Sequence, residues 1–279
     1  MNDHSSHIVK NLMQTHGIDV TRYDDSFLET SLQKRAGDTL CRSTDAYCVL
    51  LDQNHQERQV FFESLRISYS AFFRNSLTYS VLEHIILPSL LLQKRTPKPR
   101  ELRIWSAACA TGQEPYSIAM LLEELNSNSG QKSAYRIFAT DHNEAQVKEA
   151  QKGQFTAEAL NNLNLRQLRQ WFTRVGDIYS VRPALKKNIA FSVYDLFDMN
   201  SGAPPSSIFG DFDLVVCANL LFYYKPAYRT IILEKTAKCL APGGYLIAGE
   251  AERDILTRNN YREVFPQSAI FQSRGNEKP

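Results

Sequence analysis

The sequence lacks several features that would assign it to a specialised class of protein. It contains no run of about 18 apolar residues and no apolar segment near its start, so we expect neither membrane insertion nor secretion. Its five cysteines include no C-x-x-C pair and its six histidines show no ligand-like spacing, which argues against disulfides and a zinc site. The net charge of +2 gives no general attraction to nucleic acid. We therefore expect a reduced, cytoplasmic protein with no metal and no nucleic-acid partner.

The remaining composition is typical of a globular protein, with 43% hydrophobic and 22% charged residues in a chain of 279. This length accommodates one large domain or two modest ones. Residues 1–66 show helical periodicity without strand-like alternation, which predicts a small all-helical domain. Its amphipathic segments begin near Ile8, Phe27, Tyr47 and Val60. Two interpretations remain for this domain: it only packs against the rest of the chain, or it also contacts a partner.

Residues 67–100 lead into a larger domain at 101–279. They contain an apolar helical pattern from Leu77 to Leu87, and Pro88 is expected to start or kink another helical piece. From residue 102 onward, segments typical of strands alternate with segments typical of helices. The expected strands are 102–105, 136–140, 178–181, 189–193, 212–217, 245–248 and 268–273. Repeated units of this kind predict an α/β fold with a mainly parallel sheet and helices on both faces.

The segment at 102–125 is predicted to be a strand, a tight turn of small residues and a helix that begins near Pro115. This arrangement places backbone N–H groups at the carboxyl edge of a strand, where open α/β sheets bind ligands. The turn has Gly112 as its single glycine, with alanines such as Ala108 elsewhere, so it matches neither a dinucleotide-binding fingerprint nor a triphosphate-binding loop. Alone, it is equally typical of an ordinary turn between a strand and a helix.

Polar residues follow four of the expected strands. Glu114 comes after the strand expected at 102–105, Asp141 after that at 136–140, Asp195 after that at 189–193 and Asn219 after that at 212–217. The carboxyl ends of parallel strands line one crevice, so these side chains are expected to converge. A carboxylate after the second strand is suited to accepting from both hydroxyls of a ribose. Together the four positions favour a cofactor that contains adenosine.

Five stretches of the sequence resemble the CheR family of chemoreceptor glutamate methyltransferases. They are Ser-Ala-Phe-Phe-Arg, Trp-Ser-Ala-Ala-Cys-Ala-Thr-Gly-Gln-Glu-Pro-Tyr-Ser, Ala-Thr-Asp, Val-Cys-Ala-Asn-Leu-Leu-Phe-Tyr-Tyr and Leu-Ala-Pro-Gly-Gly-Tyr-Leu. The similarity runs from about residue 8 to 274, and the second stretch is highly specific. It implies a Rossmann-like class I S-adenosylmethionine-dependent methyltransferase domain, with a small β-subdomain inserted at about 172–191. A small all-α domain would precede it.

The resemblance also implies roles for individual residues. Arg74 would meet the methionine end and sulfur region of S-adenosylmethionine, and Tyr223 would lie beside the active site. The residues that would contact the cofactor are Ser68, Ser70, Arg74, Ala108, Glu114, Asp141, Asp195, Leu196, Asn219 and Leu220.

Four positions depart from the family's usual pattern. Ser68 stands where the family usually has asparagine, and Ser70 replaces a threonine. Ala218 occupies a position that is often arginine, and Asp195 one that is more often asparagine. A serine hydroxyl can still donate or accept a hydrogen bond, so we expect weaker contacts at the two serines.

The implied reaction transfers a methyl group from S-adenosylmethionine to glutamate carboxylates on the cytoplasmic helices of chemotaxis receptors, with S-adenosylhomocysteine as the product. Two alternatives remain: a methyltransferase of the same fold that acts on a non-receptor protein, and a signalling module that binds the cofactor without catalysis. Some family members dock a C-terminal receptor pentapeptide on the β-subdomain through a longer, glycine-containing loop. The corresponding loop here, Val175-Gly-Asp-Ile, is short, so we expect no pentapeptide tether. We also expect a monomer.

Overall fold

The computed structural model describes residues 20–65, 70–94, 100–130, 132–207 and 210–274. The chain divides into two compact units. The first comprises residues 1–67 together with 222–230, and the second comprises residues 68–221 together with 231–279. The helix expected near Ile8 lies outside the described residues.

The first unit is built from short helices, whose starts are marked by polar capping residues. The side chains of Asp24, Ser43 and Asn54 each accept a hydrogen bond from a backbone N–H two or three residues later. These N–H groups lie in the first turn of a helix and have no acceptor within it, so the capping side chains supply one. Leucine and aromatic side chains from the three α-helices form one buried core. The helices are η1 (Val20–Arg22), α2 (Asp25–Asp38), α3 (Thr44–Gln53) and α4 (His55–Leu65).

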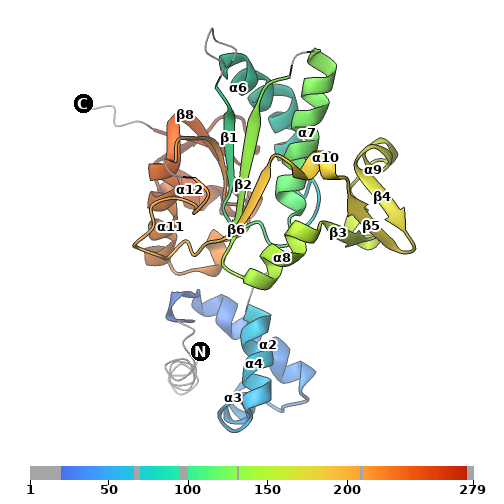
Figure 1. The fold of residues 1–279 in the computed structure, drawn as a ribbon. Coiled ribbons are helices and arrows are strands. Elements are labelled where there is room, and N and C mark those ends of the chain that lie inside the picture. Colours follow the sequence, from blue (N-terminus) through green and yellow to red (C-terminus); the bar gives the residue numbers. More distant parts are fainter. Residues whose placement is uncertain (1–19, 66–69, 95–99, 131, 208–209, 275–279) are drawn as a thin grey trace, which may run out of the picture. The chain divides into compact units, whose positions relative to one another are not determined.

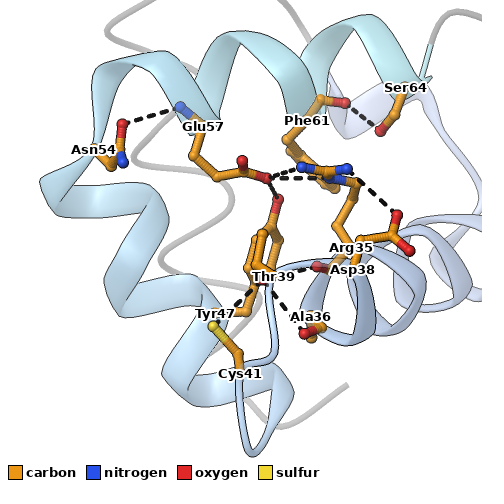
Figure 2. Close-up of polar contacts among 10 residues, drawn as sticks. All are labelled: Arg35, Ala36, Asp38, Thr39, Cys41, Tyr47, Asn54, Glu57, Phe61 and Ser64. Atoms are coloured by element: carbon orange, nitrogen blue, oxygen red, sulfur yellow. Dashed lines mark hydrogen bonds and ion pairs between the residues drawn. The ribbon is translucent and has the colours of Figure 1, made fainter.

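A polar network joins the three α-helices of this unit (Figure 2). The Oε1 atom of Glu57 accepts from Nε and Nη2 of Arg35, at 3.1 and 2.6 Å, and from the hydroxyl of Tyr47 at 2.7 Å. The hydrogen bonds to Glu57 raise the pKa of Arg35, which therefore stays charged. A partly buried carboxylate with charged and neutral donors fixes the register of the helices more specifically than apolar contacts alone.

The segment 222–230 belongs to the first unit through its contacts with residues at the start of α2. Tyr23 and Tyr224 form an antiparallel β-bridge, and their rings stack with centroids 5.2 Å apart. The N–H of Asp24 donates to the carbonyl of Tyr223 at 2.8 Å, and the Asp24 carboxylate pairs with Arg229 at 3.1 Å. A segment far along the chain is thus part of the helical unit.

The second unit begins with a helical run that contains a π-helical turn. The run consists of α5 (Ser76–Val81), the π turn η2 (Leu82–Ile86) and α6 (Leu87–Lys94). Pro88 lies in the first turn of α6. A proline ring clashes with the carbonyl four residues earlier, here that of His84, so the wider π turn relieves a conflict inside an otherwise continuous helix. The helix expected from Leu77 to Leu87 is present, and the start or kink expected at Pro88 takes the form of the π turn Leu82–Ile86 just before this proline, within a continuous helical run.

A seven-stranded sheet forms the centre of the second unit, with the strand order β6-β2-β1-β7-β8-β10-β9. The first five strands in this order are parallel, and β10 runs antiparallel to both β8 and β9. The predicted α/β fold with a mainly parallel sheet is confirmed. The strands are β1 (Leu102–Ser106), β2 (Tyr135–Asp141), β6 (Ile189–Val193), β7 (Phe212–Val216), β8 (Leu240–Ile247), β9 (Tyr261–Glu263) and β10 (Ile270–Ser273).

Alternate residues of the buried strands face two separate layers of side chains. Leu102 and Ile104 of β1 belong to a core that includes α6 and α7. The Trp105 ring instead packs edge-on against Tyr194 and tilted against Phe212. Figure 1 places α7 on one side of the sheet and α11 and α12 on the other. The helices after the first strand are α7 (Gln113–Ser129), α8 (Glu144–Lys152), η3 (Glu158–Leu160), α9 (Leu165–Trp171), α10 (Pro183–Lys186), η4 (Leu221–Tyr223), α11 (Pro226–Cys239), η5 (Glu250–Glu252) and α12 (Arg253–Arg258).

A small antiparallel sheet is inserted between β2 and β6, with the order β3-β5-β4. Its strands are β3 (Gln154–Thr156), β4 (Phe172–Val175) and β5 (Ile178–Val181). It therefore begins earlier than the expected 172–191 range and ends before β6, which pairs in parallel with β2 in the main sheet. The charged connection after β5 forms the short helix α10, with a proline in its first turn, which carries the chain from one sheet to the other.

Candidate active site

The turn between β1 and α7 is held by the neighbouring strands. The N–H of Ala107 donates to the carbonyl of Val216 at 2.8 Å, and the N–H of Cys109 donates to that of Thr140 at 2.9 Å. Gly112 has a φ of 92°, and a Cβ there would lie 3.0 Å from the Cβ of Ala150, so this position requires glycine. Ala108, which we predicted to contact a cofactor, is partly exposed in this turn.

Glu114 is the second residue of α7, and its side chain returns to the end of β1. The hydroxyl of Ser106 donates to Oε1 of Glu114 at 2.6 Å. The pKa of Glu114 is raised to about 7, mainly because the residue is removed from solvent. The hydrogen bond from Ser106 and the positive charge of Arg74 act to lower this pKa, whereas the negative charge of Glu252 acts to raise it. The charges of Arg74 and Glu252, from distant parts of the sequence, therefore act on this carboxylate, and a cation placed beside it would stabilise its ionised form.

Asp141 is the last residue of β2 and is buried. Its Oδ2 accepts from the N–H of Ala110 at 3.0 Å, and its Oδ1 accepts from the N–H of Asn143 at 2.9 Å. The carboxylate thus joins the β1–α7 turn to the start of α8. Each carboxylate oxygen can accept more than one hydrogen bond, so these contacts leave acceptor capacity for a ligand hydroxyl.

The Ser-Ala-Phe-Phe-Arg motif forms a turn that is anchored from both sides. Phe72 is fully buried, with its ring edge-on to Phe155 and Phe172. Phe73 has a φ of 47°, which is uncommon for a bulky residue, and its N–H donates to the hydroxyl of Ser117 at 3.1 Å. The turn presents Arg74 with an exposed side chain, and the positive charge of this residue acts on Glu114.

Of the two serines near this turn that we predicted to contact the cofactor, the structure describes one. Ser70 is partly buried at the start of the described segment. Ser68 lies outside the described residues. On the opposite side of the motif, Nδ2 of Asn162 donates to the carbonyl of Phe72 at 2.8 Å, which adds a second anchor to the turn.

Asp195 and Leu196 follow β6, next to the end of β2. The N–H of Tyr194 donates to the carbonyl of Asp141 at 3.0 Å, which keeps the two strand ends together. Asp195 is exposed, and its Oδ1 accepts from the N–H of Phe197 at 2.9 Å. Leu196 is buried. This pair combines an accessible carboxylate with an apolar side chain, as a site for the flat ring and exocyclic amine of a base would require.

Asn219 and Leu220 follow β7, and both are partly exposed. Asn219 has a φ of 60°, a left-handed conformation that asparagine tolerates better than most residues. Tyr223, the other residue predicted to act in catalysis, belongs to the first unit. Its ring packs edge-on against Phe27, with centroids 4.9 Å apart.

The structure brings most of the predicted residues of the second unit to one edge of the sheet. Parallel pairing in the order β6-β2-β1-β7 places the residues after these strands side by side. Sequence reasoning missed three residues that support them: Ser106, Ser117 and Glu252. Ser106 and Ser117 lie within the specific 105–117 stretch, whereas Glu252 is preceded three residues earlier by Gly249, a spacing typical of a helix start.

Comparison with known protein families shows which family this chain belongs to. A family model described as the SAM-binding domain of CheR methyltransferases matches residues 68–270, and the model of their all-alpha domain matches residues 6–65. The chain belongs to the CheR methyltransferase family. Its SAM-binding domain, matched over residues 68–270, covers most of the second unit and also contains the segment 222–230. The cofactor is therefore S-adenosylmethionine.

Several curated relatives are named chemotaxis protein methyltransferases. A chemotaxis protein methyltransferase of Listeria innocua is 36% identical over 203 residues, which cover 72% of this chain and 71% of the relative. Chemotaxis protein methyltransferase 1 of Pseudomonas aeruginosa is 32% identical over 199 residues, covering 70% and 69%. A chemotaxis protein methyltransferase of Borreliella burgdorferi is 26% identical over 267 residues, covering 95% and 92%. The similarity to the last of these extends through both units.

The side chains of this CheR site fit the cofactor. S-adenosylmethionine has a positive sulfonium and a positive ammonium, and Glu114 is a carboxylate whose burial favours a cationic neighbour. Asp141 has acceptor capacity for ribose hydroxyls, and the small residues of the turn allow close approach of a ligand to the backbone. Among the described residues, no group of His, Cys, Asp and Glu could hold a metal ion, and no helix is long and apolar enough to cross a membrane.

Proposed function

We propose that this chain transfers the methyl group of S-adenosylmethionine to glutamate side chains on the cytoplasmic helices of chemotaxis receptors, which yields glutamyl methyl esters. The observation that carries this proposal is the family match across both units, together with the effect of the Arg74 charge on the partly buried carboxylate of Glu114. The names of the curated relatives support a role in chemotaxis. S-adenosylhomocysteine would be the second product.

The acceptor needs no general base in this reaction. An unperturbed glutamate has a pKa near 4.3, so at pH 7 only about one in 500 is protonated. The bound cofactor supplies an electrophilic methyl group, and as a carboxylate oxygen forms its bond to that carbon, the carbon–sulfur bond breaks with its electron pair going to sulfur. No proton is transferred, and the charges of the carboxylate and the sulfonium are both lost. The enzyme must therefore align reactants that are already reactive.

Arg74 is the residue that we assign to this alignment. Its planar guanidinium matches the geometry of a carboxylate, and its exposed position leaves it accessible to a side chain from another protein. The anchored backbone of Phe72 and Phe73 limits where the guanidinium can go. Holding two reactants in the productive geometry is worth roughly 7–11 kcal/mol of a barrier, so positioning alone can supply much of the catalysis.

We assign the remaining residues to the cofactor. Glu114 would hold its positively charged end, and Asp141 would accept from its ribose hydroxyls. Asp195 and Leu196 would contact its base, and Ala108 would allow its close approach to the turn. We also assign Ser68, Ser70, Asn219 and Leu220 to cofactor contacts, and Tyr223 to the neighbourhood of the acceptor.

The reaction product distinguishes this function from its alternatives. Purified protein should be incubated with methyl-labelled S-adenosylmethionine and a membrane fraction that contains chemotaxis receptors. We expect labelled receptor bands whose label is released as methanol by mild alkali, because glutamyl methyl esters hydrolyse in base and N-methyl groups do not. Label that resists alkali, or that appears only on proteins other than receptors, would contradict the proposed acceptor. Binding of the cofactor with no transfer would favour a non-catalytic signalling module.

We further propose that recognition of the receptor does not depend on a C-terminal pentapeptide. The hairpin between β4 and β5 turns within Gly176 and Asp177, so it has no extended loop to enclose a peptide end. Calorimetric titration with such a pentapeptide should therefore give no measurable binding at micromolar concentrations. Saturable heat at these concentrations would contradict this prediction. We expect the protein to act as a monomer, which sedimentation of the purified protein would check.

A further inference from the structure

Glu252 is a fully buried carboxylate at the end of η5, outside all the motifs that identified the site. Transfer of a carboxylate from water to a protein interior is costly unless donors replace the lost water. Burial accordingly raises the pKa of Glu252, while hydrogen bonds from backbone N–H groups act in the opposite direction. A residue of this kind needs an explanation, because an apolar side chain would fill the same space at lower cost.

The donors that surround Glu252 come from one functional segment and from one supporting glycine. Its Oε2 accepts from the N–H of Asn219 at 2.9 Å and from that of Gly249 at 2.6 Å. Its Oε1 accepts from the N–H of Leu221 at 2.6 Å. The carboxylate thus holds the backbone on both sides of Leu220, in the segment that follows β7.

The same segment is confined from its other side by Gly249. A Cβ at this glycine would lie 2.3 Å from Nδ2 of Asn219 and 3.0 Å from its backbone nitrogen, so no other residue fits without moving Asn219. Asn219 also has the left-handed φ of 60°. A residue in this conformation persists only where its surroundings determine it, and here Glu252 and Gly249 do so.

Glu252 also acts on Glu114 through its charge. The titratable groups of the described residues that interact with Glu114 are Arg74, Tyr79, Cys109, Cys217 and Glu252. Burial raises the pKa of the tyrosine and of both cysteines well above their usual values, so these three are neutral near pH 7. Arg74 and Glu252 are the members of this set whose charges act on the pKa of Glu114, the first lowering it and the second raising it.

We propose that Glu252 is a positioning residue of the cofactor site, which fixes the backbone of Asn219–Leu221 through its carboxylate and sets the electrostatic environment of Glu114. It touches neither reactant and acts through residues that do. The inference rests on the cofactor-binding part of the proposed function. Its test is a binding measurement without a receptor, so failure of the receptor assay and failure of this inference are distinguishable.

The test compares Glu252→Gln with Glu250→Gln, a neutralisation of the exposed glutamate two residues earlier in η5. Glutamine keeps the size of Glu252, but its amide nitrogen faces backbone donors and cannot accept from them. Binding of S-adenosylhomocysteine should be measured by calorimetry between pH 5.5 and 8.5. We expect Glu252→Gln to weaken binding by about 10- to 100-fold, the range expected when hydrogen bonds to a charged group are lost. Glu250→Gln should bind as the unmodified protein does.

The pH dependence of binding separates a positioning role from a merely structural one. A structural role would not change the pH at which affinity changes. Affinity should rise as Glu114 ionises, with a midpoint near pH 7 in the unmodified protein. Loss of the negative charge at Glu252 should allow Glu114 to ionise more easily, so the midpoint should shift to lower pH. Affinity within two-fold of the unmodified protein, or weaker binding with an unmoved midpoint, would overturn the inference.

A second variant serves if Glu252→Gln does not fold. Gly249→Ala leaves the Glu252 carboxylate in place but displaces Asn219, whereas Gly202→Ala adds a methyl group where nothing lies within 4 Å. We expect weaker binding of S-adenosylhomocysteine by Gly249→Ala and unchanged binding by Gly202→Ala. Equal affinities of these two folded variants would overturn the proposed dependence of the cofactor site on the position of Asn219.

Discussion

Replacement of Arg74 by alanine should lower the rate of methyl transfer by about 10²- to 10³-fold, as expected when a preorganised charged donor is removed from an active site. The Arg74 side chain is exposed, so its removal leaves no cavity in the core. The anchors of the turn, from Ser117 to Phe73 and from Asn162 to Phe72, do not involve it. The effect should therefore appear in single-turnover transfer of labelled methyl groups to receptor membranes, with little change in melting temperature.

Two further variants show whether the effect belongs to the guanidinium. Arg74→Lys keeps the positive charge but loses the planar fork, and we expect activity between those of the alanine variant and the unmodified protein. Arg136→Ala removes an exposed arginine on β2 and should leave transfer unchanged. Full activity of Arg74→Ala would show that another group aligns the acceptor.

Replacement of Glu114 by glutamine should weaken cofactor binding by about 10- to 100-fold at pH 8 and should remove most of its dependence on pH. The pKa of Glu114 is raised to about 7 by burial, so its carboxyl is mostly neutral at pH 6 and mostly negative at pH 8. The positive end of the cofactor is attracted only to the negative form. Calorimetric affinity of the unmodified protein should thus rise from pH 6 to pH 8, and that of the variant should stay nearly constant.

The raised pKa of Glu114 also affects the stability of the protein in the absence of the cofactor. Because the pKa of Glu114 is higher in the folded state than in the unfolded chain, the protonated form favours folding. Stability from this group is fully present below about pH 4.5 and is lost as the pH rises through about 7. The ligand-free Glu114→Gln variant should therefore melt no lower than the unmodified protein at pH 8. Glu101→Gln, at an exposed position before β1, should change neither affinity nor its pH dependence.

The main sheet could be predicted from local sequence because each of its central strands is a short apolar run that ends in a polar residue. Asp141 as the last residue of β2 and Asn219 after β7 mark such ends. The edge strand β9 of the main sheet and the strands β3 and β4 of the small sheet were not predicted, because they have only three or four residues and little periodicity. The boundary between α9 and β4 falls between Trp171 and Phe172, where apolar character continues while the backbone changes.

In the candidate site too, some residues could be predicted from the sequence, whereas the residues that support them could not. Arg74 and Glu114 could be predicted because their chemistry is visible in the motifs that contain them. Glu252 could not be predicted, because its partners are backbone N–H groups and these are the same at every residue except proline. Its importance depends on which segment passes over it, and only the folded chain determines that.

The membership of Phe222–Thr230 in the helical unit constrains how this enzyme can be dissected or recombined. These residues are paired with the start of α2 by the Tyr23–Tyr224 stack and the Asp24–Arg229 ion pair. A shortened chain that began at Ser68 would lack Tyr23 and Asp24, and so would lose the ring stack with Tyr224 and the ion pair with Arg229 shortly after the Asn219–Leu221 segment. A chimaera that exchanges the helical region with that of a homologue should therefore transplant residues 20–65 and 222–230 together, as a discontinuous module.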